Sequence, residues 1–411
     1  MQRTWIKLKD FILAMNYEWK KYNLPLVLVV LILCAISVFT IWIIGTGNEV
    51  ADYGKQLIGI SIGLVIMAVV SIIDYHFICK FVVVYYLVVT ALVAATKYTP
   101  LGKNNNKEAY RWIRFPGFDL QPSELCKLMI IIVLAVLFNK LQNKLHTLLP
   151  VFLAVLVTSV PVFFIIKQPD LSSSLVILFI LGMMIYSSGA AYRVLLPVLA
   201  IAVILAGGLI WNLFQPEPMF FKPYQVGRIM GFLEPEKYPD DAYQQNMSID
   251  AISSGKLYGK YLLGGASDSR NYNKVDVTES DFIWSAIGEE YGFIGSVAII
   301  AVLFLFIILC LVVAKKAVDY LGRMIAIGIA SMFMFQVFAN IGVATMILPN
   351  TGLPLPFISS GLSAMFTYML AVGVLLNIGI QPASKALGKG FLIKNSLHDL
   401  SEIKFKTELP E

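Results

Sequence analysis

The chain is built from repeated apolar blocks, most of them about 20 residues long, which is the length a helix needs to cross a membrane core of roughly 30 Å. Such blocks lack the amphipathic alternation that is typical of surface helices in soluble proteins. They produce a composition that is 58% hydrophobic and only 14% charged, against roughly 25% charged in ordinary soluble domains. A soluble globular fold is therefore excluded.

The blocks predict an all-α integral membrane protein, a bundle of about ten transmembrane helices. The predicted spans are Leu24–Ile44, Leu57–Ile73, Phe77–Ala95, Ser123–Phe138, Leu148–Ile166, Leu171–Ser188, Leu195–Phe214, Phe282–Val313, Met324–Leu348 and Leu362–Ile380. The membrane domain covers residues 24–380, between tails at 1–23 and 381–411. Two connections are long: the loop 97–122, and the large loop 215–281 between the seventh and eighth spans, where we expect a short interfacial helix at Tyr243–Ser254.

Basic residues gather in the tails and short loops, which predicts a topology. They include Lys20, Lys21, Lys315, Lys316 and Arg323. With an even number of spans, both tails are cytoplasmic and both long loops are extracytoplasmic. The placement of the charges thus explains the net charge of +6 as a feature of topology. We expect membrane lipids around the chain and no nucleic-acid partner. The loop 97–122 is basic although it lies outside, which favours a binding role for charges such as Arg111.

The fourth span begins with a polar motif that contains Gln121, Ser123, Glu124 and Lys127. Glu124 and Lys127 are three residues apart, so they lie on one helix face and can form an ion pair. In one interpretation Ser123 caps the helix and Lys127 extends towards the interface. In the other interpretation, Lys127 faces a polar cavity and an anionic substrate. This interpretation is favoured, because ionisable residues within a span usually face the interior of the bundle.

The eighth span begins with Asp281, where a carboxylate can act as a base, bind a cation or cap the helix. Glu289 and Glu290 follow about 12 Å further along the helix. Gln336 and Asn340 of the ninth span are candidate hydrogen-bond partners for these two glutamates. A structural network between helices explains the deeper residues at least as well as direct catalysis does.

Two loops contain further candidates. Gln225 and Arg228 could contact phosphate or sugar, although an exposed arginine is more often only solvated. The loop after the ninth span contains Pro354 and Pro356, and irregular backbone at membrane depth occurs only where protein buries it or where it lines a cavity.

The absence of some sequence features restricts the chemistry. The four cysteines have no paired spacing that predicts a disulfide or zinc site, and the three histidines fall in predicted cytoplasmic segments. No Walker-type phosphate loop is present, so we expect no nucleotide cofactor. An extracytoplasmic reaction would then use carboxylates and a substrate that arrives already activated, such as a prenyl-pyrophosphate sugar.

These segments resemble the SEDS family of bacterial shape, elongation, division and sporulation proteins, to which RodA, FtsW and SpoVE belong. The likeness covers nearly the whole chain and rests on Arg111-Trp112-Ile113, Gln121-Pro122-Ser123-Glu124-Leu125-Cys126-Lys127-Leu128, Gln168-Pro169-Asp170-Leu171, Asp281-Phe282-Ile283, Gly288-Glu289-Glu290, and Asn340-Ile341-Gly342 followed by the Pro-rich loop. The chain departs from the family at Glu279-Ser280, where His-Thr is usual, and at Ser360-Gly361-Leu362, where a Tyr-Gly-Gly run is usual.

The resemblance implies a peptidoglycan glycosyltransferase that polymerises lipid II in the bacterial cytoplasmic membrane, with inversion and release of undecaprenyl pyrophosphate. It implies that Asp281 is the essential carboxylate, with Glu124 and Lys127 beside it and Trp112 and Arg228 as secondary candidates. It also implies a class B penicillin-binding protein as partner, and a place for a divalent cation, Mg or Mn, with Asp281 as its ligand.

Two other functions remain open from the sequence. A lipid II flippase or other multi-pass transporter would also place polar residues inside a helix bundle. A non-catalytic scaffold for a penicillin-binding protein would need no polymerase activity, but it gives no reason for Glu124, Lys127 and Asp281 to lie on one side.

Overall fold

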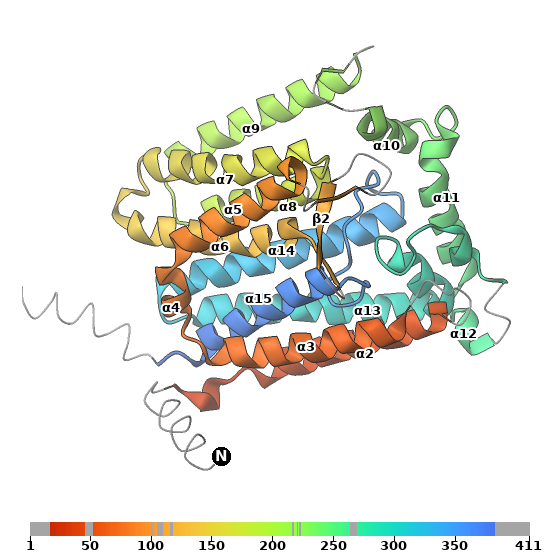
Figure 1. The fold of residues 1–411 in the computed structure, drawn as a ribbon, viewed down its shortest axis with the longest axis horizontal. Helices are drawn as coiled ribbons and strands as arrows, with labels where there is room; N and C mark the ends of the chain where they lie inside the picture. Colours follow the sequence, from red (N-terminus) through yellow and green to blue (C-terminus); the bar gives the residue numbers. More distant parts are fainter. Residues whose placement is uncertain are drawn as a thin grey trace, which may run out of the picture.

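The computed structural model describes residues 17–45, 52–99, 102–104, 110–115, 118–215, 218–219, 221, 223–263 and 269–382. The predicted tails fall mostly outside these ranges, because residues 1–16 and 383–411 are not among them. The described ends meet: the Glu18 amide donates a 3.0 Å hydrogen bond to the Ile380 carbonyl. Figure 1 shows that they lie at the opposite end of the molecule from α10, α11 and α12.

The apolar blocks form a bundle of helices, which confirms the predicted fold class. Within the described ranges, eight helices are long and apolar enough to cross a membrane: α2 (Leu24–Gly45), α3 (Tyr53–Ile72), α6 (Pro122–Lys140), α7 (Leu149–Lys167), α9 (Tyr192–Leu213), α13 (Ile283–Lys316), α14 (Tyr320–Ala344) and α15 (Leu362–Ile380). Two predicted spans form shorter apolar helices, α5 (Val82–Tyr98) and α8 (Leu171–Ser187). The predicted third span is divided, because a separate helix α4 (Tyr75–Lys80) precedes α5.

The centre of the bundle is formed by α6, α13, α14 and α15, which contain most of the fully buried side chains. Helix α14 packs against α13, α8 and α6, while α15 packs along α3. Helix α9 lies at the edge of the bundle (Figure 1), and most of its side chains are exposed. Such an exposed apolar helix is what a hydrocarbon environment allows, because lipid replaces protein contacts there.

The two long connections are folded. Residues 102–120 include an antiparallel three-stranded sheet of β1 (Gly102–Asn104), β2 (Tyr110–Phe115) and β3 (Phe118–Leu120), which the sequence analysis did not predict. The large loop contains α10 (Pro223–Leu233), α11 (Pro239–Ser254) and α12 (Lys260–Leu263), so the predicted helix at Tyr243–Ser254 is confirmed as the greater part of α11. Short 3-10 turns are η1 (Trp19–Lys21), η2 (Gln142–Lys144) and η4 (Asn271–Lys274).

Helix α13 is too long to be a simple span, since its 34 residues would extend about 51 Å at 1.5 Å per residue. The backbone leaves the helical conformation at Gly292, where φ is 63°. Because this is the left-handed region, a residue without Cβ is favoured there. The amides of Phe293 and Ile294 donate to the carbonyls of Lys256 and Leu257. Residues 283–291 therefore pack with α11 and do not continue the membrane-crossing part of α13.

Candidate active site

A polar cavity of about 350 Å³ lies between the small sheet, the loop before α13 and the Pro-rich loop before α15. Four of its lining side chains are carboxylates and one is a guanidinium. It is lined by Arg111, Trp112, Gln121, Glu124, Asp170, Ser173, Glu279, Ser280, Asp281, Gly352, Leu353, Pro354, Ser360, Gly361 and Ala364. Segments that are far apart in the sequence thus converge on one polar space.

Asp281 lies half-buried at the wall of this cavity. Its carboxylate accepts a long hydrogen bond of 3.4 Å from Ser280 Oγ. Burial raises the pKa of Asp281, and the nearby Arg228 charge opposes that rise. The capping interpretation is wrong, because the N-cap of α13 is Phe282 and no side chain caps the helix. The carboxylate is therefore available to a ligand in the cavity.

Asn340 fixes the position of Asp281. Its side-chain amide donates to the Asp281 carbonyl at 2.8 Å and to the Leu353 carbonyl at 2.7 Å. One buried residue of α14 thus joins the segment that precedes α13 to the Pro-rich loop. The expected pairing of Asn340 and Gln336 with Glu289 and Glu290 is wrong, since Gln336 donates instead to the Tyr368 hydroxyl at 3.2 Å.

Arg228 approaches Asp281 from α10, next to Gly352. A Cβ built on Gly352 would lie 3.1 Å from Asp281 Oδ2 and 3.9 Å from an Arg228 Nη, so both charged groups flank the same point. Gly352 has a φ of +69° and no side chain, which allows this close approach. Burial lowers the pKa of Arg228, and the positive charge of Arg111 lowers it further. Two guanidinium groups therefore lie close to one side of the cavity.

Glu124 and Lys127 form the predicted ion pair, with Lys127 Nζ 2.7 Å from Glu124 Oε1. Lys127 is fully buried and does not line the cavity, so the expectation that it faces the cavity is wrong. Glu124, and not Lys127, lines the cavity. Its Oε2 is buried and has no hydrogen-bond partner among the described residues. Lys127 thus compensates the charge of Glu124, while Glu124 offers one oxygen to a ligand.

Asp170, which the sequence analysis quoted only as part of a motif, is a central residue of the cavity wall. Its carboxylate accepts from Ser123 Oγ at 3.1 Å and Gln121 Nε2 at 3.4 Å, and it caps α8 through the Ser173 amide at 3.2 Å. Ser123 therefore binds Asp170 and does not cap α6. Although burial acts to raise the pKa of Asp170, the Arg111 charge and these hydrogen bonds lower it overall. Asp170 thus remains ionised opposite Arg111.

Arg111, Trp112, Gln121 and Pro354 line the cavity as predicted site residues, whereas Glu289 and Glu290 lie outside its lining. Glu289 accepts from the amides of Asn271 and Tyr272 at 3.0 and 2.8 Å and pairs with Lys260. Glu290 accepts from Arg270 Nε at 2.7 Å. Both glutamates hold the large loop against α13, so the structural-network interpretation is correct but its partners come from the loop.

Gln225 is buried in α10, and Pro356 is buried in the loop and, unlike Pro354, does not line the cavity. The lining residues that sequence reasoning missed are mostly small: Ser173, Ser280, Gly352, Ser360 and Gly361. For Ser173 the available signal was its position just after Asp170, and for the others it was their position beside Asp281 or in the Pro-rich loop. Small and hydroxylated residues have little sequence pattern of their own, because their role here comes from where the backbone places them.

The expected divalent cation finds only a partial ligand set. Within the described ranges, no group of three or more His, Cys, Asp or Glu side chains is arranged to hold a metal. Magnesium, however, is commonly bound by one or two carboxylates together with substrate phosphates and water. Asp281 meets that limited requirement, since only Ser280 is seen to donate to its carboxylate within the described part of the chain.

The fold and the cavity together define a class, a polytopic membrane protein that encloses carboxylate and guanidinium groups at one end of its helix bundle. The chain belongs to the FtsW/RodA/SpoVE family, because residues 21–384 match the family profile described as "Cell cycle protein". This covers every helix of the bundle.

Individual relatives agree with that assignment. The chain is 31% identical to the probable peptidoglycan glycosyltransferase FtsW of Trichlorobacter lovleyi, over 89% of this chain and 95% of that protein. It is 29% identical to the peptidoglycan glycosyltransferase MrdB of Escherichia coli, over 88% and 94% of the two chains. It is also 29% identical to the stage V sporulation protein E of Bacillus subtilis, over 87% and 98%.

Solved structures share the architecture. A chain from a peptidoglycan synthase complex, whose structure was described in terms of coordinated polymerization and crosslinking, superposes with a TM-score of 0.70 at 25% identity, over 88% of this chain and 98% of that chain. The rod shape determining protein RodA of Thermus thermophilus superposes with a TM-score of 0.61 at 21% identity, over 88% and 97%, which supports the fold alone.

Proposed function

We propose that this protein is a peptidoglycan glycosyltransferase that polymerises lipid II at the cavity around Asp281. The observation that carries the proposal is one carboxylate, placed by Asn340 and flanked by Arg228, in a polar cavity of a chain whose relatives are named as peptidoglycan glycosyltransferases. Burial raises the pKa of such a carboxylate and so its basicity, and a neighbouring cation favours its ionised form. Together they suit a general base.

The reaction is a single displacement with inversion at the anomeric carbon. The 4-hydroxyl oxygen of the acceptor sugar forms a bond to the anomeric carbon of the donor. The bond from that carbon to the pyrophosphate oxygen breaks, and undecaprenyl pyrophosphate leaves with the bonding electrons. Asp281, in its ionised form, takes the proton from the attacking hydroxyl.

Two arginines suit the leaving group. Arg111 lines the cavity from β2, and Arg228 lies beside Asp281. Guanidinium groups bind phosphate oxygens through parallel hydrogen bonds, and they stabilise the charge that develops as the pyrophosphate departs. The sequence predicted a binding role for the basic residues of the loop 97–122. Here Arg111 takes that role, as a ligand of the pyrophosphate.

Glu124 suits the sugar. Its free Oε2 in the cavity wall can accept a hydrogen bond from a hydroxyl or amide group of the substrate, and leaving such a buried oxygen without a donor is costly. Lys127 lies behind it and keeps its charge compensated. Glu124 is thus assigned to substrate binding, Lys127 to positioning Glu124, and Trp112 to the cavity wall.

A divalent cation, Mg or Mn, is the alternative task for Asp281, whose carboxylate would then hold the ion together with substrate oxygens instead of taking the acceptor proton. The ion would supply positive charge to the pyrophosphate leaving group. In either case, the other residues of the cavity orient the acceptor and bind the departing phosphates.

We propose that the cavity opens on the outer face of the cytoplasmic membrane. In support, the basic residues Lys20, Lys21, Lys315 and Lys316 lie in the last turns of η1 and α13, at the end of the bundle away from α10–α12 (Figure 1), as the positive-inside tendency requires of a cytoplasmic face. A class B penicillin-binding protein is the proposed partner, by analogy with the synthase complex whose chain superposes on this one.

Purified protein in lipid vesicles with labelled lipid II tests the proposal. We expect glycan polymer from the wild type and none from Asp281→Asn, which keeps the side-chain shape but removes its basicity. Asp250→Asn is the matched control, since it makes the same change at an exposed carboxylate of α11 that does not line the cavity, and it should retain polymerisation. Flipping of lipid II without polymer would instead identify a transporter. The absence of both flipping and polymerisation, with or without the partner, would identify a scaffold.

A further inference from the structure

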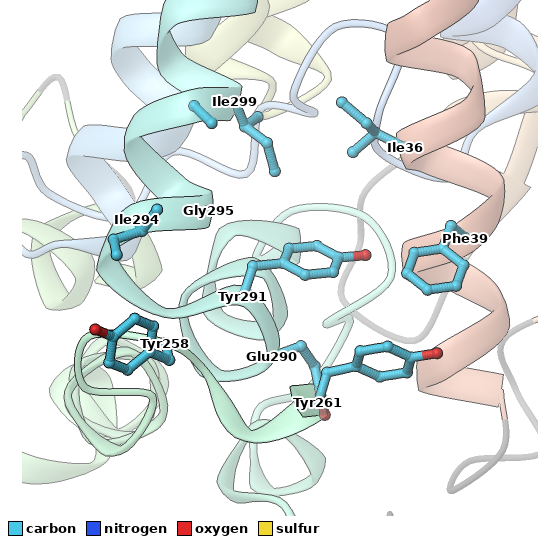
Figure 2. A pocket seen from close by; sticks show the side chains of 10 residues that line it. Ile36, Phe39, Tyr258, Tyr261, Glu290, Tyr291, Ile294, Gly295 and Ile299 are labelled. Atoms are coloured by element: carbon cyan, nitrogen blue, oxygen red, sulfur yellow. The ribbon is translucent and has the colours of Figure 1, made fainter. Parts of the chain in front are cut away.

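A second hollow lies on the outside of the bundle, where α2 passes α13 (Figure 2). It has a volume of about 420 Å³, and its lining is almost wholly apolar and aromatic. We call it the α2–α13 groove; it is lined by Ile36, Phe39, Tyr258, Tyr261, Glu290, Tyr291, Ile294, Gly295, Ala298 and Ile299. None of these residues lines the cavity around Asp281, so the groove is a separate feature.

The polar groups in the depth of the groove already have partners. Glu290 accepts from Arg270 Nε at 2.7 Å, and the Tyr291 hydroxyl is hydrogen-bonded to Thr40 Oγ1 at 2.8 Å. A charged or strongly polar ligand would lose its hydration and gain no new partner from these groups. The chemistry of the groove therefore selects an apolar occupant.

The groove has a direction. Figure 2 shows Tyr258 and Tyr261 at one end, Ile36 and Ile299 at the other, and Tyr291 between them. Along the part of α13 that follows the break at Gly292, the step from Ile294 to Ile299 corresponds to about 7.5 Å into the apolar part of the helix. Tyrosines are enriched where membrane meets water, so the groove runs from the interface into the hydrocarbon layer.

We propose that the α2–α13 groove binds one hydrocarbon chain of a membrane phospholipid. The groove is continuous with the lipid-facing surface, because Phe293, Ile294 and Val297 beside it are exposed apolar side chains. Since a cavity of about 150 Å³ holds one benzene ring, this volume accommodates roughly 17 carbon atoms, which is close to one acyl chain.

A chain in this groove would contact both sides of the break in α13. Tyr291 precedes Gly292 and Ile294 follows it, and both line the groove. The stretch 283–291 begins directly after Asp281 and Phe282. A bound chain therefore fills the joint between the loop that contains Asp281 and the membrane-crossing part of α13, and it stabilises their relative placement.

Photo-crosslinking tests the site. The protein is placed in nanodiscs of phosphatidylethanolamine and phosphatidylglycerol with a trace of phosphatidylcholine that carries a diazirine near its chain end, and labelled peptides are mapped by mass spectrometry. We expect label concentrated on Ile36–Phe39 and on residues 291–299. Ala298→Phe fills the groove and should reduce that label at least fivefold, as should Ile36→Trp from the opposite wall.

Val297→Phe is the matched control, because it adds the same ring to an exposed neighbour that does not line the groove, and it should leave the label unchanged. Elution profile and melting temperature identify any variant that fails to fold, and the second wall variant then decides. Label spread evenly over lipid-facing helices, or undiminished by both wall variants, would overturn the proposal. Displacement by undecaprenyl phosphate but not by unlabelled phospholipid would overturn it in favour of a polyprenyl site.

Discussion

Arg228→Gln removes the positive charge that lies beside Asp281. Burial raises the pKa of the Asp281 carboxyl, and Arg228 opposes the rise. Without the arginine charge, the ionised form of Asp281 loses its main source of electrostatic stabilisation. Its pKa should therefore increase further, and the fraction of enzyme with an ionised base at a given pH should fall.

The structure limits the size of this effect. Asp281 Oδ2 lies 3.1 Å and an Arg228 Nη 3.9 Å from the same point, the place of a Cβ on Gly352. At a separation of at most about 7 Å and an effective dielectric constant of about 20, two unit charges interact by roughly 2.4 kcal/mol. At 1.36 kcal/mol per pKa unit this is about 1.7 units, and the partial exposure of Asp281 reduces the expected shift to about one unit.

The assay is the pH dependence of lipid II polymerisation at limiting substrate. Activity requires ionised Asp281, so it rises with pH through the pKa of that carboxyl, and Arg228→Gln should move this rising limb upward by about one unit. Arg228→Lys keeps the charge and should keep the midpoint. A lower rate at every pH with an unmoved midpoint would refute the reasoning, because Arg228 would then act only on the substrate.

Glu124→Gln leaves the buried Lys127 ammonium without its partner and should lower the free energy of unfolding by about 3–5 kcal/mol. Combining it with Lys127→Met should restore the melting temperature but not polymerisation; restored activity would show that Glu124 binds no substrate. Gly352→Ala forces a Cβ into the left-handed region, which costs roughly 1–2 kcal/mol, and places it 3.1 Å from the Asp281 carboxylate. Polymerisation should fall at least tenfold, whereas Gly182→Ala, which has no neighbouring atoms within 4 Å, should be neutral. At the other end of the bundle, burial acts to lower the pKa of His76, but hydrogen bonds to Asp319 and Asp74 outweigh it and raise the pKa from 6.5 to about 9. His76 thus contributes stability that is complete below pH 6.5 and is lost as pH rises through about 9. Thermal unfolding across that range should show this loss in the wild type, and its persistence in His76→Gln would contradict the assignment.

The sequence alone determined the helical membrane architecture, because a hydrocarbon layer imposes one requirement on every span: an apolar helix of sufficient length. That requirement is local, so the apolar blocks predicted the helices to within a few residues. The Glu124–Lys127 pair was predictable for the same reason, since helix geometry places residues three positions apart on one face. The resemblance added Asp281 as the essential carboxylate, a role that the proposed assay tests.

Only the tertiary structure decided how these residues meet. Glu124 and Asp170 come from different helices, and Asn340 contacts Asp281 across 59 positions of sequence, so no local periodicity relates them. The break at Gly292 likewise depends on carbonyls of the large loop, which accept hydrogen bonds from the residues after it. Glu289 and Glu290, expected deep in the bundle, instead bind the large loop. Backbone requirements within a span follow from the solvent around it, whereas the partners of buried polar groups depend on which segments pack together, and that packing is set by the whole chain.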